Sequence, residues 1–323
     1  MASLLSVENL QVQFQTKKGI NTAVDGVSFS VEKGRILGIV GESGCGKSVT
    51  SMSILQLLGS NARISGGSIK LDGKELIGLP EKEMCRIRGN DIAMICQDPM
   101  TALNPTLTIG TQLMEPIMLH QNCGKKEAWT RAVDVLKRVG IAAPEKRMKE
   151  YPHQLSGGMR QRVMIAMAVS CEPRLLIADE PTTALDVTIQ AQILELMCEL
   201  REKMGTAIML ITHDMGVVAE TADDVLVLYA GKAVEYGSIE DIFERPKHPY
   251  TQGLLNSIPR LDEDVELLNT IEGTVPAPDA MPAGCRFAPR CPYGKDRCMK
   301  EKPGVYHAGN SLVSCFRYEG EKE

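Results

Sequence analysis

The fold of this chain is decided by the glycine-rich stretch Gly41-Glu42-Ser43-Gly44-Cys45-Gly46-Lys47-Ser48. A continuous apolar run at residues 36–40 precedes it and predicts a buried strand, and residues 49–58 after it predict a helix. A glycine loop between a strand and a helix is the setting in which this pattern binds phosphate. The glycines allow several backbone N–H groups to point inward, and the helix N-terminus adds a positive dipole end. We therefore predict a phosphate-binding loop in an α/β protein, with an ordinary glycine turn as the alternative.

Length and composition indicate a globular protein without a membrane span. The chain has 323 residues, enough for about two domains. Its hydrophobic content of 43% and net charge of −5 are ordinary, and no basic excess predicts a nucleic-acid partner. No apolar run approaches the ~20 residues that span a bilayer, and the first residues lack a signal-peptide layout. We expect a cytosolic protein that a partner subunit can hold at the membrane surface.

The remaining apolar patterns alternate between strands and helices. Strands are predicted at residues 5–14, 22–31, 69–71, 92–95, 175–178, 207–212 and 225–229. Helices are predicted at residues 125–139, 157–171 and 187–204. The first two strands are expected to pair antiparallel, whereas the later strands indicate a largely parallel sheet covered on both faces. Residues 106–151 read as a helical insertion, on which Trp129 is interpreted as a packing residue.

Polar residues follow two of the predicted buried strands. Asp179 and Glu180 follow one strand, at the sheet edge where α/β proteins bind ligands. Asp179 suits Mg²⁺, and Glu180 can accept a proton from an attacking water. His213 follows the next strand and is expected to reach the γ-phosphate region. Gln97 follows a further strand and can contact Mg²⁺ and the attacking water. Each residue taken alone is more often structural, and the phosphate-binding loop is what favours these roles.

A second glycine-containing stretch is Leu155-Ser156-Gly157-Gly158-Met159, which we call the signature segment. It opens a predicted helix and offers further N–H groups to an anion, although one nucleotide site does not need two such segments. At this point the sequence resembles the ATP-binding subunit of ABC transporters, over about residues 4–250. The motifs that carry the resemblance, in order, are residues 41–48, Gln97, the signature segment, Asp179-Glu180, Ala184-Leu185-Asp186 and His213.

The resemblance implies a site shared between two ATP-binding domains packed head to tail. The expected ATP-binding residues are Phe14, Gly41, Ser43, Gly44, Cys45, Gly46, Lys47, Ser48 and Val49. Ser156, Gly157, Gly158 and Asp186 are expected to meet the ATP held by the partner subunit. The expected Mg²⁺ ligands are Ser48, Gln97 and Asp179. The expected catalytic residues are Glu180 as base, His213 as switch, Gln97 and Lys47. Phe14 is expected to stack on adenine, with core packing as its alternative role.

A finer resemblance points to the dipeptide and oligopeptide branch of the family, which also includes nickel importers. It rests on residues 97–105, 151–154 and 248–251, and on Arg290-Cys291-Pro292 in the C-terminal part. The resemblance implies an ATP-hydrolysing motor subunit of a peptide importer, bound peripherally at the cytoplasmic face of the membrane. Its implied partners are a second ATP-binding subunit, in a homodimer or heterodimer, two membrane permeases and an external substrate-binding protein. The transported substrate is not predicted.

Four of the ten cysteines, Cys285, Cys291, Cys298 and Cys315, lie close together near the C-terminus. In a reducing compartment such a group points to metal rather than to disulfides. No pair has the CxxC spacing usual in zinc sites, and four thiolates suit either a 4Fe-4S cluster or tetrahedral zinc. We favour the iron–sulfur cluster; the alternatives are zinc, thiols without metal, and redox-labile disulfides.

The predicted fold is an α/β ATP-binding cassette with an antiparallel β subdomain and a helical subdomain. The ATP-binding domain is placed at residues 1–245, with its helical subdomain at about 100–170. A linker and a small irregular cysteine-rich extension are placed at residues 246–323. Three other functions were weighed. A P-loop kinase leaves the signature segment and His213 without a role, whereas a soluble ABC-type ATPase and a metal-bound docking module with a nucleotide-gated switch remain alternatives.

Overall fold

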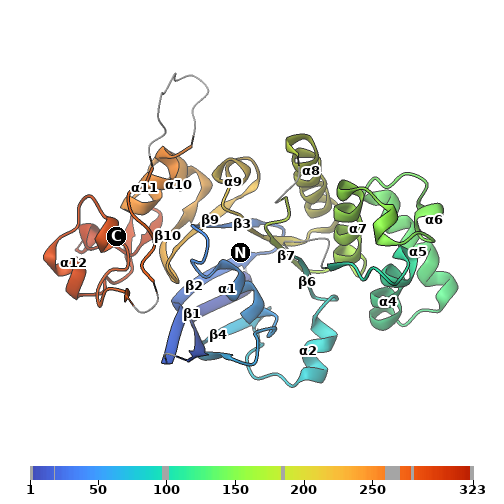
Figure 1. The fold of residues 1–323 in the computed structure, drawn as a ribbon, viewed down its shortest axis with the longest axis horizontal. Helices are drawn as coiled ribbons and strands as arrows, with labels where there is room; N and C mark the ends of the chain where they lie inside the picture. The colour runs from blue at the N-terminus through green and yellow to red at the C-terminus, as the bar shows by residue number, and fades with distance from the viewer. Residues whose placement is uncertain are drawn as a thin grey trace.

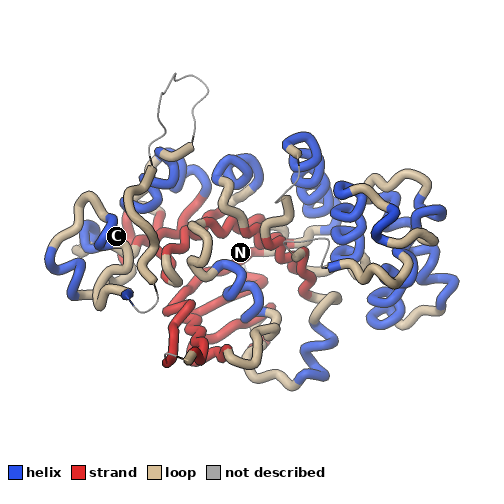
Figure 2. Tube along the Cα trace, viewed as in Figure 1, coloured by secondary structure: helices blue, strands red, loops and turns tan. Residues whose placement is uncertain are grey.

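The computed structural model describes residues 3–17, 19–96, 102–182, 186–258, 270–277 and 280–320. Its strands form two sheets that face each other around the helix that follows the phosphate-binding loop (Figures 1 and 2). Gln97, Ala184 and Leu185 lie outside the described residues.

The smaller sheet is antiparallel and has the strand order β2-β1-β4-β5. Its strands are β1 (Ser3–Thr16), β2 (Gly19–Glu32), β4 (Ala62–Leu71) and β5 (Lys74–Glu75). Apolar residues alternate along β1, and Leu5, Leu10 and Val12 are fully buried. The prediction of an antiparallel first pair is confirmed.

The larger sheet has the order β11-β12-β10-β9-β3-β8-β7-β6. Its strands are β3 (Ile36–Val40), β6 (Ile92–Ile95), β7 (Leu175–Asp179), β8 (Ala207–Ile211), β9 (Asp224–Tyr229), β10 (Lys232–Ser238), β11 (Tyr306–Ala308) and β12 (Ser311–Val313). The run from β9 to β6 is parallel, and every residue of β3, β7 and β8 is buried. Continuous apolar strands buried on both faces are what a parallel sheet requires.

Helices cover the larger sheet and form a separate group at one end of the molecule (Figure 1). They are α1 (Lys47–Ile54), α2 (Glu81–Ile87), α4 (Ile109–Gln121), α5 (Lys125–Arg138), α6 (Pro144–Arg147), α7 (Gly157–Val169), α8 (Val187–Met204), α9 (Met215–Thr221), α10 (Ile239–Glu244), α11 (Pro249–Asn256) and α12 (Asp296–Lys300). The predicted insertion corresponds to α4, α5 and α6, and Trp129 packs against the core there. Helix α1 ends at Ile54, earlier than predicted. Within the described ranges no helix has both the length and the apolar character to cross a bilayer.

The C-terminal part contributes strands to the larger sheet, which the sequence did not indicate. Strand β12 pairs antiparallel with β10, through Glu235 opposite Val313, and β11 pairs with β12. Val313 is fully buried, as is Phe287 within the cysteine-bearing segment. The cysteine-bearing part therefore shares the core of the larger sheet.

Candidate functional site

The phosphate-binding loop connects the buried strand β3 to helix α1. Gly41 has a φ of +151°, and a Cβ placed there would lie 2.1 Å from the carbonyl oxygen of Leu228. Gly46 has a φ of +104°, and its Cβ would lie 3.1 Å from the carbonyl oxygen of Ala23. The glycine pattern is therefore required by backbone conformation and by close approach to strands β9 and β2.

Lys47 holds its ammonium group inside the loop. The residue is 5% exposed, and Nζ donates hydrogen bonds to the carbonyl oxygens of Gly41 at 2.6 Å and Glu42 at 3.2 Å. Ser43 and Gly44 form the exposed tip of the loop, whereas Cys45 is buried. Nζ also donates to the Sγ atom of Cys45 at 3.9 Å. A buried cation with these neutral partners is well placed to donate to a phosphate oxygen instead.

Asp179, the last residue of β7, approaches the start of α1. Burial raises the pKa of its carboxyl group and the Glu180 charge adds to this, while a hydrogen bond from Ser48 and the Lys47 charge lower it. One oxygen, Oδ1, is buried and has no hydrogen-bond partner among the described residues. Because buried oxygens are nearly always paired and Mg²⁺ prefers oxygen ligands, Ser48 and Asp179 fit a magnesium site.

Glu180 and His213 lie together at the same sheet edge. Glu180 Oε1 is 3.5 Å from Nδ1 of His213, and the side chains are 17% and 63% exposed, respectively. Glu180 has a φ of +47°, and its N–H donates to the carbonyl oxygen of Ile211 at 2.8 Å. A non-glycine residue in this region is strained, and such strain concentrates at functional sites.

The signature segment opens helix α7. Ser156 caps the helix by accepting a hydrogen bond from the Met159 N–H at 3.3 Å. Gly157 is exposed, and a Cβ at that position would contact nothing within 4 Å. In Figure 1, α7 belongs to the helical group at one end, whereas α1 lies centrally. Within the described ranges, no hydrogen bond or ion pair joins residues 156–158 to residues 41–48. The structure thus places the two predicted anion-binding segments apart within one chain.

Three further predicted residues occupy structural positions. Asp186 caps helix α8 by accepting a hydrogen bond from the Ile189 N–H at 2.9 Å, and it is exposed. Phe14 lies near the end of β1, half-buried, and packs against the core between the two sheets. Val49 packs against the same core. Stacking of Phe14 on adenine and sensing of a partner by Asp186 stay predictions.

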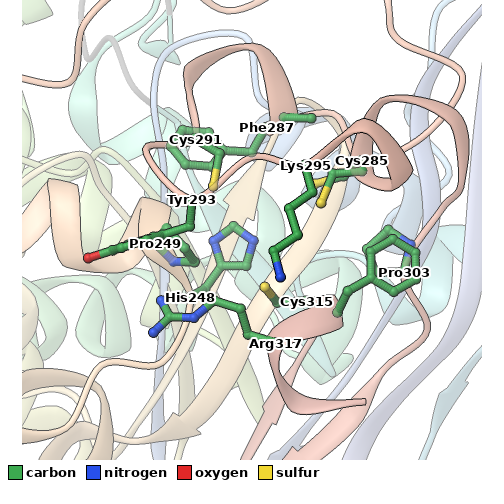
Figure 3. Close-up of a pocket in the computed structure, with 13 residues that line it drawn as sticks. His248, Pro249, Cys285, Phe287, Cys291, Tyr293, Lys295, Pro303, Cys315 and Arg317 are labelled. Atoms are coloured by element: carbon green, nitrogen blue, oxygen red, sulfur yellow. The ribbon is translucent and has the colours of Figure 1, made fainter.

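The four C-terminal cysteines line one cavity of about 80 Å³, which we call the thiol cavity. Figure 3 shows the sulfur atoms of Cys285, Cys291 and Cys315 directed toward the same space, into which Lys295 also extends. All ten cysteines are free thiols. Burial raises the pKa of Cys285 to about 11. In the ranges that are described, no three His, Cys, Asp or Glu side chains are arranged to hold a metal ion. The geometry thus does not support the predicted zinc or iron–sulfur site by itself.

Sequence reasoning missed residues that connect this cavity to the phosphate-binding loop. Arg290 pairs with Glu42, and Tyr250 accepts a hydrogen bond from the Glu42 N–H at 3.0 Å. Both residues lie in the short motifs that carried the finer resemblance, at 248–251 and 290–292. Their presence in those motifs was the only available signal, because nothing local predicts a contact across 200 residues or more.

The comparisons with known proteins agree with this fold and site. Residues 24–183 match the family described as ABC transporter, and residues 234–298 match the oligopeptide/dipeptide transporter C-terminal region. The dimeric structure of MJ0796, a bacterial ABC transporter cassette, has a TM-score of 0.65 at 27% identity and covers 73% of this chain and 98% of that one. CbiO1 from Clostridium perfringens, part of the transporter complex cbiONQ, has a TM-score of 0.64 at 27% identity, covering 76% and 92%. Fold and site thus define an ABC-type ATPase.

Full-length relatives identify the branch. The chain is 56% identical over 323 residues to the oligopeptide transport ATP-binding protein AppD of Bacillus subtilis, covering 99% of this chain and 98% of that protein. It is 51% identical over 315 residues to the oligopeptide transport ATP-binding protein OppD of Escherichia coli, covering 98% and 93%. The chain belongs to the family of ATP-binding proteins of oligopeptide and dipeptide ABC transporters.

Proposed function

We propose that this chain hydrolyses ATP within a dimer of ATP-binding subunits and thereby powers the import of oligopeptides or dipeptides. The observation that carries the proposal is the separation of the signature segment from the phosphate-binding loop of the same chain. An exposed helix N-terminus with open space at Gly157 is available to a nucleotide held by another subunit. The dimeric form of MJ0796 supports the same arrangement.

The residues of the site divide the reaction between them. Lys47 exchanges its carbonyl partners for phosphate oxygens and neutralises negative charge. Glu180 accepts the proton of the attacking water, and His213 orients the Glu180 carboxylate and contacts the γ-phosphate. Mg²⁺ would be held by Ser48 and Asp179, with Gln97 as a further predicted ligand, and would supply charge neutralisation at the nucleotide phosphates. Backbone N–H groups at Ser156, Gly157 and Gly158 of the partner subunit point at the phosphates of the same nucleotide.

We assign residues 1–245 to the ATP-binding domain, with the helical subdomain at about 100–170, and residues 246–323 to the C-terminal extension. The family match at 24–183 falls within the first part, and the match at 234–298 begins within strand β10 and extends over most of the second part. The partners are a second ATP-binding subunit, two permeases and a substrate-binding protein outside the cell, and the chain sits peripherally on the cytoplasmic face of the membrane. The names of the relatives as peptide transport proteins favour this role over that of a soluble switch.

Reconstitution with the permeases tests the function. The purified ATP-binding subunits, permeases and binding protein are assembled in vesicles, and phosphate release is measured with and without peptide. We expect peptide to stimulate hydrolysis and peptide to accumulate inside. Hydrolysis at an undiminished rate without permeases, together with no peptide uptake in the full assembly, would favour the soluble ATPase instead.

We further propose that the thiol cavity holds a 4Fe-4S cluster. All four C-terminal thiols line this one cavity, and four thiolates are the ligand set of such a cluster, with tetrahedral zinc as the alternative. Iron and sulfide are measured on anaerobically purified protein, together with the visible absorption spectrum. Cys291→Ser is expected to lose iron, whereas Cys123→Ser, at a thiol distant from the cavity in sequence, retains it. Stoichiometric zinc without iron would reject the cluster.

A further inference from the structure

The segment Cys285–Cys291 connects the thiol cavity to the phosphate-binding loop. Cys285 and Cys291 at its ends line the cavity. Between them, Arg286 donates a hydrogen bond to Asp25 at 3.0 Å and another to the carbonyl oxygen of Ala230. The next residue, Gly231, donates its N–H to the carbonyl oxygen of Cys45 at 2.8 Å. Arg286 therefore contacts the turn at Ala230 and Gly231, which is hydrogen-bonded to the phosphate-binding loop.

The second arginine contacts the loop directly. Nη1 of Arg290 donates to both carboxylate oxygens of Glu42, at 2.9 and 3.0 Å. Nε and Nη2 donate to the carbonyl oxygens of Glu272 and Ile271, at 2.9 and 3.1 Å. The Arg290 side chain is 6% exposed and that of Glu42 is 29% exposed. A buried guanidinium that donates hydrogen bonds through all three of its nitrogens holds its partner in a fixed position, and loss of either member leaves the other charge unpaired.

An aromatic cluster fixes the backbone of the same loop residue. The Glu42 N–H donates to the hydroxyl of Tyr250, which is fully buried. The Tyr250 ring lies 4.7 Å from that of Tyr229 and 5.4 Å from that of Phe287, centroid to centroid. Phe287 belongs to the Cys285–Cys291 segment and lines the thiol cavity beside His248 (Figure 3). Both the side chain and the N–H of Glu42 are thus held by C-terminal residues.

We propose that Arg290 is a positioning residue for ATP binding: through Glu42 it holds the phosphate-binding loop in its binding conformation. Glu42 matters because its carbonyl oxygen accepts a hydrogen bond from Lys47 at 3.2 Å. A shift of Glu42 therefore moves one of the groups that hold the phosphate-binding lysine. Since Arg290 directly precedes Cys291, a movement of the cysteine-bearing segment would also shift Arg290 and, through Glu42, the nucleotide site. This inference rests on the proposed function of residues 41–48 as the ATP site.

A double-mutant cycle tests the coupling. Arg290→Met keeps the apolar stem without the charge, and Glu42→Gln keeps the shape of its partner. The dissociation constant of a fluorescent ATP analogue with Mg²⁺ is measured for both variants and for the double variant. We expect each single substitution to raise the dissociation constant about tenfold. The double variant is expected to bind no more weakly than either single variant, because both substitutions remove the same interaction. Arg297→Met is the matched control, because Arg297 pairs with Glu301 and Glu319 and does not contact the loop.

Hydrogen exchange distinguishes a local effect on the phosphate-binding loop from a general loss of stability. Amides of residues 41–48 are expected to exchange faster in Arg290→Met and in Glu42→Gln than in the wild type, while those of β8 stay protected. Wild-type affinity in Arg290→Met, or additive losses in the double variant, would overturn the positioning role. A wild-type protein that binds no nucleotide would refute the proposed ATP site, and the inference with it.

Discussion

Oε1 of Glu180 lies 3.5 Å from Nδ1 of His213, and the two residues follow the adjacent parallel strands β7 and β8. The two side chains reach one point because parallel strands end at the same edge of the sheet. Glu180 also adopts a left-handed backbone conformation, which the hydrogen bond from its N–H to Ile211 maintains. The Glu180 carboxylate thus lies beside the exposed His213 imidazole at this edge of the sheet.

Glu180→Gln removes the proposed base without changing its size. We expect ATP binding to be retained and turnover to fall by about 10²-fold or more, since a positioned base contributes about 10²–10⁴-fold. Single-turnover phosphate release and nucleotide binding are measured side by side. Glu195→Gln, at an exposed position on α8, is the control and is expected to behave as wild type. Wild-type turnover in Glu180→Gln would remove Glu180 from the role of base.

Gly157→Glu tests the contribution of the partner subunit. Because nothing lies within 4 Å of the added Cβ, the variant is expected to fold normally and to bind ATP in its own loop. The new carboxylate would repel the phosphates of the facing nucleotide, so hydrolysis and ATP-dependent dimerisation are expected to be lost by about 10²-fold or more. Light scattering and phosphate release measure the two effects. Gly124→Glu changes another open glycine before a helix and is expected to have no effect; equal losses in both variants would contradict the shared site.

Asp179→Asn tests, in the absence of Mg²⁺, whether the buried carboxylate lowers the stability of the folded chain. Burial raises the pKa of Asp179 in the folded chain above its value of 3.8 in the unfolded chain. The folded state therefore keeps the proton to higher pH, and its stability decreases as the pH rises through the folded pKa. We expect the variant without Mg²⁺ to melt at a higher temperature than wild type, by a difference that grows as the pH rises toward the folded pKa of Asp179 and is constant above it. Thermal melts with chelator from pH 4 to 8 check this, and a difference that does not change anywhere in this range would contradict it.

The same substitution should weaken nucleotide binding in the presence of Mg²⁺, because the amide lacks the charge that the ion requires. ATP affinity is therefore measured with Mg²⁺ and with chelator. A wild-type dependence on Mg²⁺ in Asp179→Asn would remove Asp179 from the ligand set.

The thiol reactivity of Cys285 is expected to be low in metal-free protein. A pKa raised to about 11 by burial leaves only about 0.1% thiolate at pH 8. Exposed Cys85 should therefore react with iodoacetamide well before Cys285, whose rate should rise about tenfold per pH unit between pH 7 and 9. Peptide mass mapping after timed labelling measures both rates. Similar rates for the two thiols at pH 7 would contradict the burial of Cys285.

Gly41→Ala tests the steric requirement of the loop. The added methyl group would meet the Leu228 carbonyl oxygen at 2.1 Å. We therefore expect the free energy of unfolding to fall by about 2–4 kcal/mol, and ATP binding to be lost. Gly44→Ala is the matched control, since its φ of +77° costs strain but nothing lies within 4 Å of the new atom. A loss of only about 1 kcal/mol is expected there. Chemical denaturation measures both, and equal losses would show that strain rather than contact sets the requirement.

Local patterns along the chain predict those parts of the protein that depend on neighbouring residues. Apolar continuity predicted the buried strands β3, β7 and β8, and the glycines predicted the loop between β3 and α1, because both depend on neighbouring residues only. The order of the motifs pointed to the family. The C-terminal cysteines were recognisable as a group for the same reason.

Contacts between residues far apart in the sequence become visible only in the folded chain. The fold joined Arg290 to Glu42, brought Glu180 to His213 and added β12 to the sheet beside β10. It also arranged the four C-terminal cysteines around one cavity. Contacts between residues far apart in the chain depend on the relative placement of strands and helices, which burial of the whole core sets and no local pattern of residues encodes.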